Sequence, residues 1–166
     1  MTTTQADRSV RPVTVSEVSL PLDARALSTL SRIDYEDAFI VDAGVELTAA
    51  QWVRAVVHDA PLGLRARLIS GWIALGLKLG GPWSARRVLG WKVQQSGRGF
   101  VLLAANSWFG FRGELLFRSE PRGLLFATFV QQNNPAARGV WAMITPRHRR
   151  VVRSLLAHAA RREASR

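Results

Sequence analysis

The segment from residue 135 to residue 161 constrains the fold of this chain most strongly. A stripe of mostly apolar residues recurs there at steps of three and four, the spacing of one helix face: Ala137, Trp141, Ile144, His148, Val151, Leu155 and Ala159. Asn134 is a favourable N-cap residue, and Pro135 suits the first helical position. Because the stripe keeps its phase across Pro146, we predict one long helix from Pro135 to about Arg161, kinked by this proline.

Four candidate strands precede this helix. Alternating or continuous apolar runs occur at about 89–94, 100–106, 111–118 and 124–132, with the turn sequences SGRG and SEPRG among them. Short strands separated by such turns indicate an antiparallel meander. We expect one face of the meander to be core and the other to be partly wet. The amphipathic helix would cover the core face.

The first part of the chain adds one strand and two helices. Ala38–Asp42 is a candidate strand. Thr48 and Gln51 form a capping-box pattern that starts a helix ending near Pro61. A second helix is predicted over about residues 62–79, and it carries too many charges and glycines for a membrane span.

These elements predict an α+β fold, in which a curved antiparallel sheet wraps around a long C-terminal helix. Two shorter helices follow the first strand. Residues 1–19 are polar without a clear period, and we expect a flexible arm there. Residues 20–162 form a single domain in this interpretation, and 163–166 are a basic tail.

The charge of the chain is unevenly distributed. The formal net charge is +11, and it sums to −4 over residues 1–60, +8 over 61–137 and +7 over 138–166. This asymmetry suggests attraction to an anionic partner. Only two of the cations are lysines, so a coding bias towards arginine explains the composition equally well. The absence of cysteine and of a secretory signal favours a cytoplasmic location.

Motifs that carry chemistry are scarce. His58, His148 and His158 lack metal-ligand spacing, and neither a G-x-S-x-G elbow nor a phosphate loop occurs, so we expect no metal and no cofactor. His148, on the helix stripe, is either a proton carrier or polar anchor in a cavity, or the partner of a carbonyl freed by Pro146. His58 with Asp59 is either an acid/base pair or the polar end of a helix.

Aromatic residues are the other candidates for a site. Trp72, Trp91, Trp108 and Trp141 lie on different predicted elements, where they line either an apolar pocket or a plain core. A loop carrying Trp108, Phe109 and Phe111 could gate a pocket, contact a bilayer surface or pack against the helix pair. Three arginines of the meander match no nucleic-acid reader, so a nucleic-acid partner is not expected: Arg112, Arg118 and Arg122.

Three segments carry a resemblance to a known family. They are DYEDAF at 34–39, VVHDAPLGLRARLISGWIALGLKLG at 56–80 and VWAMITPRHRRVVRSLLAHAARR at 140–162. Over about Leu20–Arg162 the chain resembles the SRPBCC superfamily of START-type, helix-grip proteins, and within it a bacterial family of unknown function. The resemblance implies a hydrophobic cavity between sheet and helix. Superfamily members bind lipids, sterols or polyketides, and some are cyclases or hydroxylase components.

We therefore expect the chain to bind a hydrophobic or amphipathic small molecule. The candidate ligand-binding residues are Trp72, Trp91, Phe111, Phe129, Trp141, Ile144 and His148. One alternative is a cyclase- or hydratase-type enzyme that uses the same pocket, with His148 or Asp59 as proton carrier. Another is a peripheral protein that docks on anionic membranes through arginines and Trp108–Phe109. The sequence does not decide between these functions, and it does not give the oligomeric state.

Overall fold

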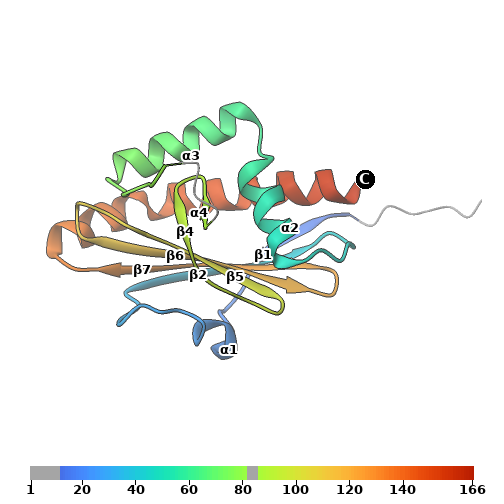
Figure 1. Ribbon diagram of the computed structural model, residues 1–166, viewed down its shortest axis with the longest axis horizontal. Helices are drawn as coiled ribbons and strands as arrows, with labels where there is room; N and C mark the ends of the chain where they lie inside the picture. The colour runs from blue at the N-terminus through green and yellow to red at the C-terminus, as the bar shows by residue number, and fades with distance from the viewer. Residues whose placement is uncertain (1–11, 82–85) are drawn as a thin grey trace, which may run out of the picture.

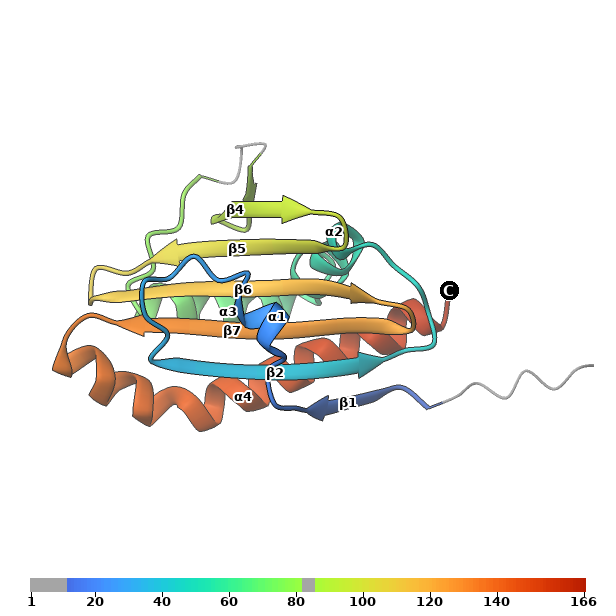
Figure 2. The same ribbon diagram turned by 90° about the horizontal axis from the view of Figure 1, so that it is seen from below.

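The computed structural model describes residues 12–81 and 86–166, which form a helix-grip fold (Figures 1 and 2). The described strands make one antiparallel sheet in the order β1-β2-β7-β6-β5-β4-β3. The strands are β1 Thr14–Glu17, β2 Tyr35–Asp42, β3 Arg87–Val88, β4 Trp91–Gly97, β5 Phe100–Asn106, β6 Phe111–Glu120 and β7 Gly123–Gln132. The helices are α1 Leu22–Arg25, α2 Ala49–Val53, the π-helix η1 Arg54–His58, α3 Leu62–Ala74 and α4 Pro135–Ala164. The predicted meander is confirmed.

Helix α4 lies along one face of the sheet, on the same side as α2 and α3 (Figure 1). Its predicted N-cap is confirmed, because the Ala137 amide donates to Asn134 Oδ1 at 2.7 Å. The helix is continuous across Pro146, and the Thr145 hydroxyl donates to the Trp141 carbonyl at 2.7 Å, one turn earlier. The helix runs to Ala164, three residues beyond its predicted end, and so includes the first two residues of the predicted basic tail.

The sheet is buried on both faces at its centre, since all ten residues of β7 are buried. The face away from α4 is covered by residues 18–34, which include α1 and which we call the strap. Apolar strap residues pack against Leu102, Leu116 and Leu125: Val18, Leu20, Leu27, Leu30 and Ile33. The expectation of a partly wet second face is therefore wrong at the centre. The strap residues show no regular apolar period, so the sequence pattern did not predict that this segment covers the second face of the sheet.

The predicted N-terminal arm is also wrong in part. Residues 14–17 form β1, which pairs antiparallel with β2 through Val15 with Val41 and Glu17 with Phe39. Four residues are too few for a periodic signal, and the strand is held by backbone hydrogen bonds at the sheet edge. Residues 1–11 of the predicted arm lie outside the described residues.

The helices after β2 follow their predicted starts more closely than their predicted ends. The capping box is confirmed, with the Gln51 amide donating to Thr48 Oγ1 at 3.2 Å and the Thr48 amide donating to Gln51 Oε1 at 2.8 Å. Helix α3 ends at Ala74 rather than near residue 79 because Gly76 takes a left-handed backbone conformation, with φ of 63°. No residue of α3 is fully buried.

Glu114 fastens the strap to the sheet. Its side chain is buried on the outer face of β6, with 1% of the residue exposed. Its carboxyl group accepts hydrogen bonds from the Ser28 hydroxyl at 2.7 Å, from the Thr29 amide at 3.1 Å and from the Thr29 hydroxyl.

We expect Glu114→Ala to lower the free energy of unfolding by about 1–3 kcal/mol, because the Ser28 and Thr29 donors of the strap lose their acceptor. Urea denaturation measures this loss. Glu120→Ala is the matched control on the same strand and face, where the half-exposed ion pair with Arg118 at 3.0 Å contributes less than about 1 kcal/mol. Equal losses in the two variants would contradict the role given to Glu114.

Candidate functional site

A cavity lies on the α4 side of the sheet, between α3, α4 and strands β4, β6 and β7. Its volume is ≈ 70 Å³. Strand alternation explains part of its lining, since Gly113 pairs with Val130 and Leu115 with Thr128, and all four face the same side. The complete lining is Trp72, Leu75, Leu77, Trp91, Phe111, Gly113, Leu115, Thr128, Val130, Trp141 and His148.

Gly113 is the only glycine among the described residues that line the cavity. It occupies an inward position on β6, flanked in the same row by Phe111 and Leu115. A Cβ at this position would lie 3.5 Å from the Trp91 ring, which is ordinary contact distance, so sterics do not require glycine here. A glycine inside a strand often marks the close approach of a ligand or another backbone.

Aromatic rings form the walls of the cavity. Trp72 and Trp91 meet edge to face with ring centroids 5.6 Å apart. On the other side Trp141 lies 5.9 Å from Phe111 and 5.3 Å from the His148 ring. These five are sequence-predicted site residues, and the structure brings them together around one cavity.

The two other predicted site residues lie elsewhere. Ile144 does not line the cavity but packs beside it, against the cluster that contains Phe111 and Trp141. The expectation for Phe129 is wrong, because this side chain is fully buried on the opposite face, under the strap. Its neighbours Thr128 and Val130 face the cavity, so strand alternation turns Phe129 away from it.

A buried polar cluster adjoins the cavity at His148. His148 Nε2 lies 3.3 Å from Asp37 Oδ2 and 3.3 Å from Thr128 Oγ1. Asp37 and Thr128 are directly paired on β2 and β7, while His148 reaches them from α4, two residues after Pro146. The Tyr35 hydroxyl donates to Asp37 Oδ2 at 2.6 Å, and Arg149 Nε donates to the Tyr35 oxygen at 3.1 Å.

The protonation states in this cluster follow from its contacts. Burial is the largest influence on Asp37 and opposes its ionisation, but the hydrogen bond and charge of His148 act against it. Together with hydrogen bonds from Tyr35 and Thr128, they hold the pKa of Asp37 below its usual value. Burial, reinforced by the bond to Asp37, raises the pKa of Tyr35 well above its usual value. At neutral pH Asp37 is thus a carboxylate and Tyr35 a neutral donor.

Three buried polar atoms at this site have no hydrogen-bond partner among the described residues. They are Asp37 Oδ1 and the indole Nε1 atoms of Trp91 and Trp141. Both tryptophans line the cavity and are more than nine-tenths buried. Buried donors without partners are uncommon and costly, so these two N–H groups are candidate partners for an acceptor in the cavity.

The sequence interpretation missed the polar half of this site. Tyr35 and Asp37 lie in the segment DYEDAF, and Asp37 occupies the same inward row of β2 as the buried Phe39 and Val41. A carboxylate in such a row is the signal that could have identified it. Gly113, at the inward position of an otherwise bulky row, is a second such signal.

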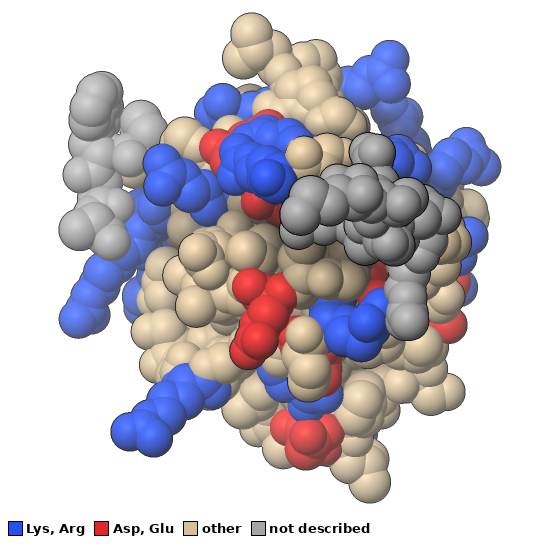
Figure 3. Space-filling view, turned by 90° about the vertical axis from the view of Figure 1, so that its right-hand side faces the viewer, with Lys and Arg blue, Asp and Glu red and all other residues tan. Residues whose placement is uncertain are grey.

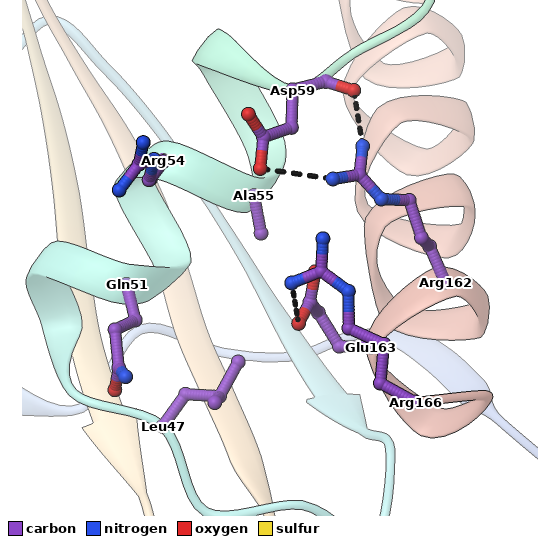
Figure 4. Close-up of a pocket in the computed structure, with 8 residues that line it drawn as sticks. All are labelled: Leu47, Gln51, Arg54, Ala55, Asp59, Arg162, Glu163 and Arg166. Carbon is purple, nitrogen blue, oxygen red and sulfur yellow. Dashed lines mark hydrogen bonds and ion pairs between the residues drawn. The ribbon is translucent and has the colours of Figure 1, made fainter.

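A second hollow lies between the α2–η1 segment and the end of α4 (Figure 4). Its volume is ≈ 440 Å³, and charged side chains dominate its lining. Arg162 Nη2 lies 2.9 Å from Asp59 Oδ2, and Arg166 Nη1 lies 3.1 Å from Glu163 Oε2, as the dashed lines in Figure 4 show. The carboxylates of this hollow are thus paired with arginines of the same hollow.

The position of Asp59 corrects one expectation. Asp59 lines the second hollow and not the cavity beside His148, so it is not a proton carrier in that cavity. Its neighbour His58 is exposed and lies 3.3 Å from Asp59 Oδ1. The alternative interpretation, polar residues that end a helix, agrees with Asp59 as the C-cap of η1.

The described residues contain no group of three or more histidine, aspartate or glutamate side chains suited to hold a metal ion. Within the same ranges, 12–81 and 86–166, no helix has the length and apolarity needed to cross a membrane. Comparison of the chain with protein-family models, curated proteins and solved structures finds no match.

Proposed function

We propose that this protein binds a small amphipathic molecule, apolar in its body and with at least one acceptor oxygen, in the cavity beside His148. The observation that carries this proposal is the lining of the cavity. It combines aromatic walls, an inward glycine and two buried indole N–H groups that have no partner among the described residues. Convergent polar groups in an apolar pocket are the usual composition of a small-molecule site.

The size of the cavity limits how such a molecule is held. Its ≈ 70 Å³ is well below the roughly 300–1,000 Å³ of pockets that enclose a whole drug-sized ligand. It accommodates the oxygen-bearing end of a ligand. A longer acyl or ring portion requires α3 to move, and this helix is suited to do so because no residue of it is fully buried.

His148 is the polar anchor of the site in this proposal. Asp37 fixes its ring through Nε2, and no hydrogen bond to Nδ1 is found within the described part of the chain. We expect His148→Ala to weaken binding of decanoic acid roughly tenfold or more, the effect of losing a charge-assisted hydrogen bond. Isothermal titration calorimetry measures this change. His158→Ala, on the same helix and outside the cavity lining, is the control and should bind as the wild type does.

A proton-transfer enzyme of cyclase or hydratase type is the second candidate. The Asp37–His148 contact favours it, since a carboxylate that orients a histidine is a common arrangement for acid/base catalysis. Mass spectrometry distinguishes a protein that only retains its ligand from an enzyme, because it shows whether the bound molecule has been converted to a product. Conversion that His148→Ala abolishes while binding persists would favour the enzyme, and an unchanged bound molecule in the wild type would favour retention.

A further inference from the structure

Large apolar side chains are exposed at the end of the molecule where β5 turns into β6 and α4 begins. We call this set the end patch. Its residues and exposed fractions are Ile73 64%, Trp108 76%, Phe109 58%, Val140 39% and Met143 75%. Isolated exposed apolar residues are ordinary on soluble proteins, but a cluster marks an interaction surface.

The segments that carry the end patch are tied together. The Trp108 amide donates to the Gly76 carbonyl at 2.9 Å, and Asn134 Nδ2 donates to the Phe109 carbonyl at 3.1 Å. The β5–β6 turn therefore joins the end of α3 to the N-cap of α4. Figures 1 and 2 both show these three segments at the same end of the molecule.

The surroundings of the end patch are basic. Residues 60–113 and 121–162 contain no aspartate or glutamate and eight cationic residues each. Lys78 Nζ lies 3.8 Å from the centroid of the Trp108 ring. Arg147 is exposed one turn after Met143 on α4, and no ion pair of either cation is found among the described residues. The opposite end differs, because Figure 3 shows acidic side chains interspersed among the basic ones there.

We propose that the end patch docks on the surface of an anionic lipid bilayer. Tryptophan and phenylalanine beside aliphatic side chains suit the boundary between headgroups and acyl chains, and flanking lysine and arginine contact lipid phosphates. Ile73, Val140 and Met143 favour acyl chains over nucleic-acid bases, which stack on aromatic rings. A second copy of this chain is disfavoured, because two equally basic patches repel each other. The proposal goes beyond cavity binding and does not depend on it.

Vesicle co-sedimentation tests this proposal. The wild type should bind vesicles of a two-to-one mixture of phosphatidylcholine and phosphatidylglycerol, bind pure phosphatidylcholine weakly, and lose binding as salt is raised. Lys78→Glu with Arg147→Glu should weaken binding at least roughly 25-fold, since each basic residue contributes about fivefold. Trp108→Ser with Met143→Ser should weaken it at least roughly tenfold.

Two matched control variants test whether the loss of vesicle binding is specific to the end patch, because they make the same kinds of substitution elsewhere on the surface. Leu22→Ser with Leu62→Ser removes apolar side chains that are 82% and 81% exposed but lie outside the patch. Arg98→Glu with Arg161→Glu makes the same charge change on the β4–β5 turn and near the end of α4. Both control proteins should bind vesicles as the wild type does.

Three results would overturn the proposal. They are no binding of the wild type to anionic vesicles, equal losses in patch and control variants, and a self-association that Trp108→Ser removes in analytical ultracentrifugation. Gly113→Val, which narrows the cavity, should leave vesicle binding unchanged. The docking proposal and the cavity proposal therefore fail independently.

Discussion

Gly113→Val is expected to abolish ligand binding in the cavity while leaving the fold intact. The valine side chain would project from β6 towards the Trp91 ring and take up part of the ≈ 70 Å³ cavity that both residues line. The substitution replaces glycine in a strand interior with a residue that favours strands, so the free energy of unfolding should stay equal or rise by about 0.5–1 kcal/mol. Titration with decanoic acid, followed by tryptophan fluorescence, measures binding, and urea denaturation measures stability.

Gly113→Ala is the graded control for this prediction. Its Cβ would lie at ordinary contact distance, 3.5 Å from the Trp91 ring, and would leave most of the cavity free. We expect weakened but measurable binding of decanoic acid. Wild-type affinity in the Gly113→Val protein, with its stability retained, would show that the ligand does not occupy this cavity.

Asp37→Ala is expected to lower the free energy of unfolding by about 1–3 kcal/mol, the cost of removing a buried acceptor from its hydrogen-bond partners. The carboxylate is buried between β2 and α4, and its removal takes the acceptor from the Tyr35 hydroxyl and one of two contacts from His148 Nε2. Asp42→Ala is the control on the same strand, where the carboxylate is 44% exposed and pairs with Arg122. It should cost less than about 1 kcal/mol in urea denaturation.

The lowered pKa of Asp37 also predicts how stability depends on pH. Its folded-state pKa lies below the unfolded value of 3.8, so the ionised group stabilises the fold above that pH. This contribution is lost as the pH falls through the folded pKa. Asp37→Asn should therefore show a flatter acid limb than the wild type in denaturation midpoints measured from neutral pH downwards. Identical acid limbs in the two proteins would contradict the assigned ionisation.

The sequence correctly predicted those strands and helices whose characteristic pattern lies within one continuous segment. Alternation and turn residues identified β5, β6 and β7, and the stripe from Ala137 to Ala159 identified α4. The Thr48–Gln51 capping box placed the start of α2 to the residue. In each case the physical cause is short-range, namely side-chain periodicity, cap hydrogen bonds or turn conformation.

Features that depend on contacts distant in sequence were not predicted. The face of the sheet on which Phe129 lies could not be predicted, because β7 is buried on both faces and its sequence does not alternate between apolar and polar residues. The reason for two apolar faces is the strap, whose attachment to Glu114 joins residues more than eighty positions apart. Asp37 was missed for a similar reason, since its partners Thr128 and His148 lie on β7 and α4.

Native mass spectrometry of the protein purified from its own host, followed by organic extraction, is the most direct test of ligand binding in the cavity beside His148. We expect a stoichiometric adduct of an apolar, oxygen-bearing molecule in the wild type and no adduct in Gly113→Val. A protein that carries no adduct and takes up nothing from a panel of fatty acids and sterols would contradict ligand binding in this cavity. The cavity beside His148 would then be a gap in the core rather than a binding site.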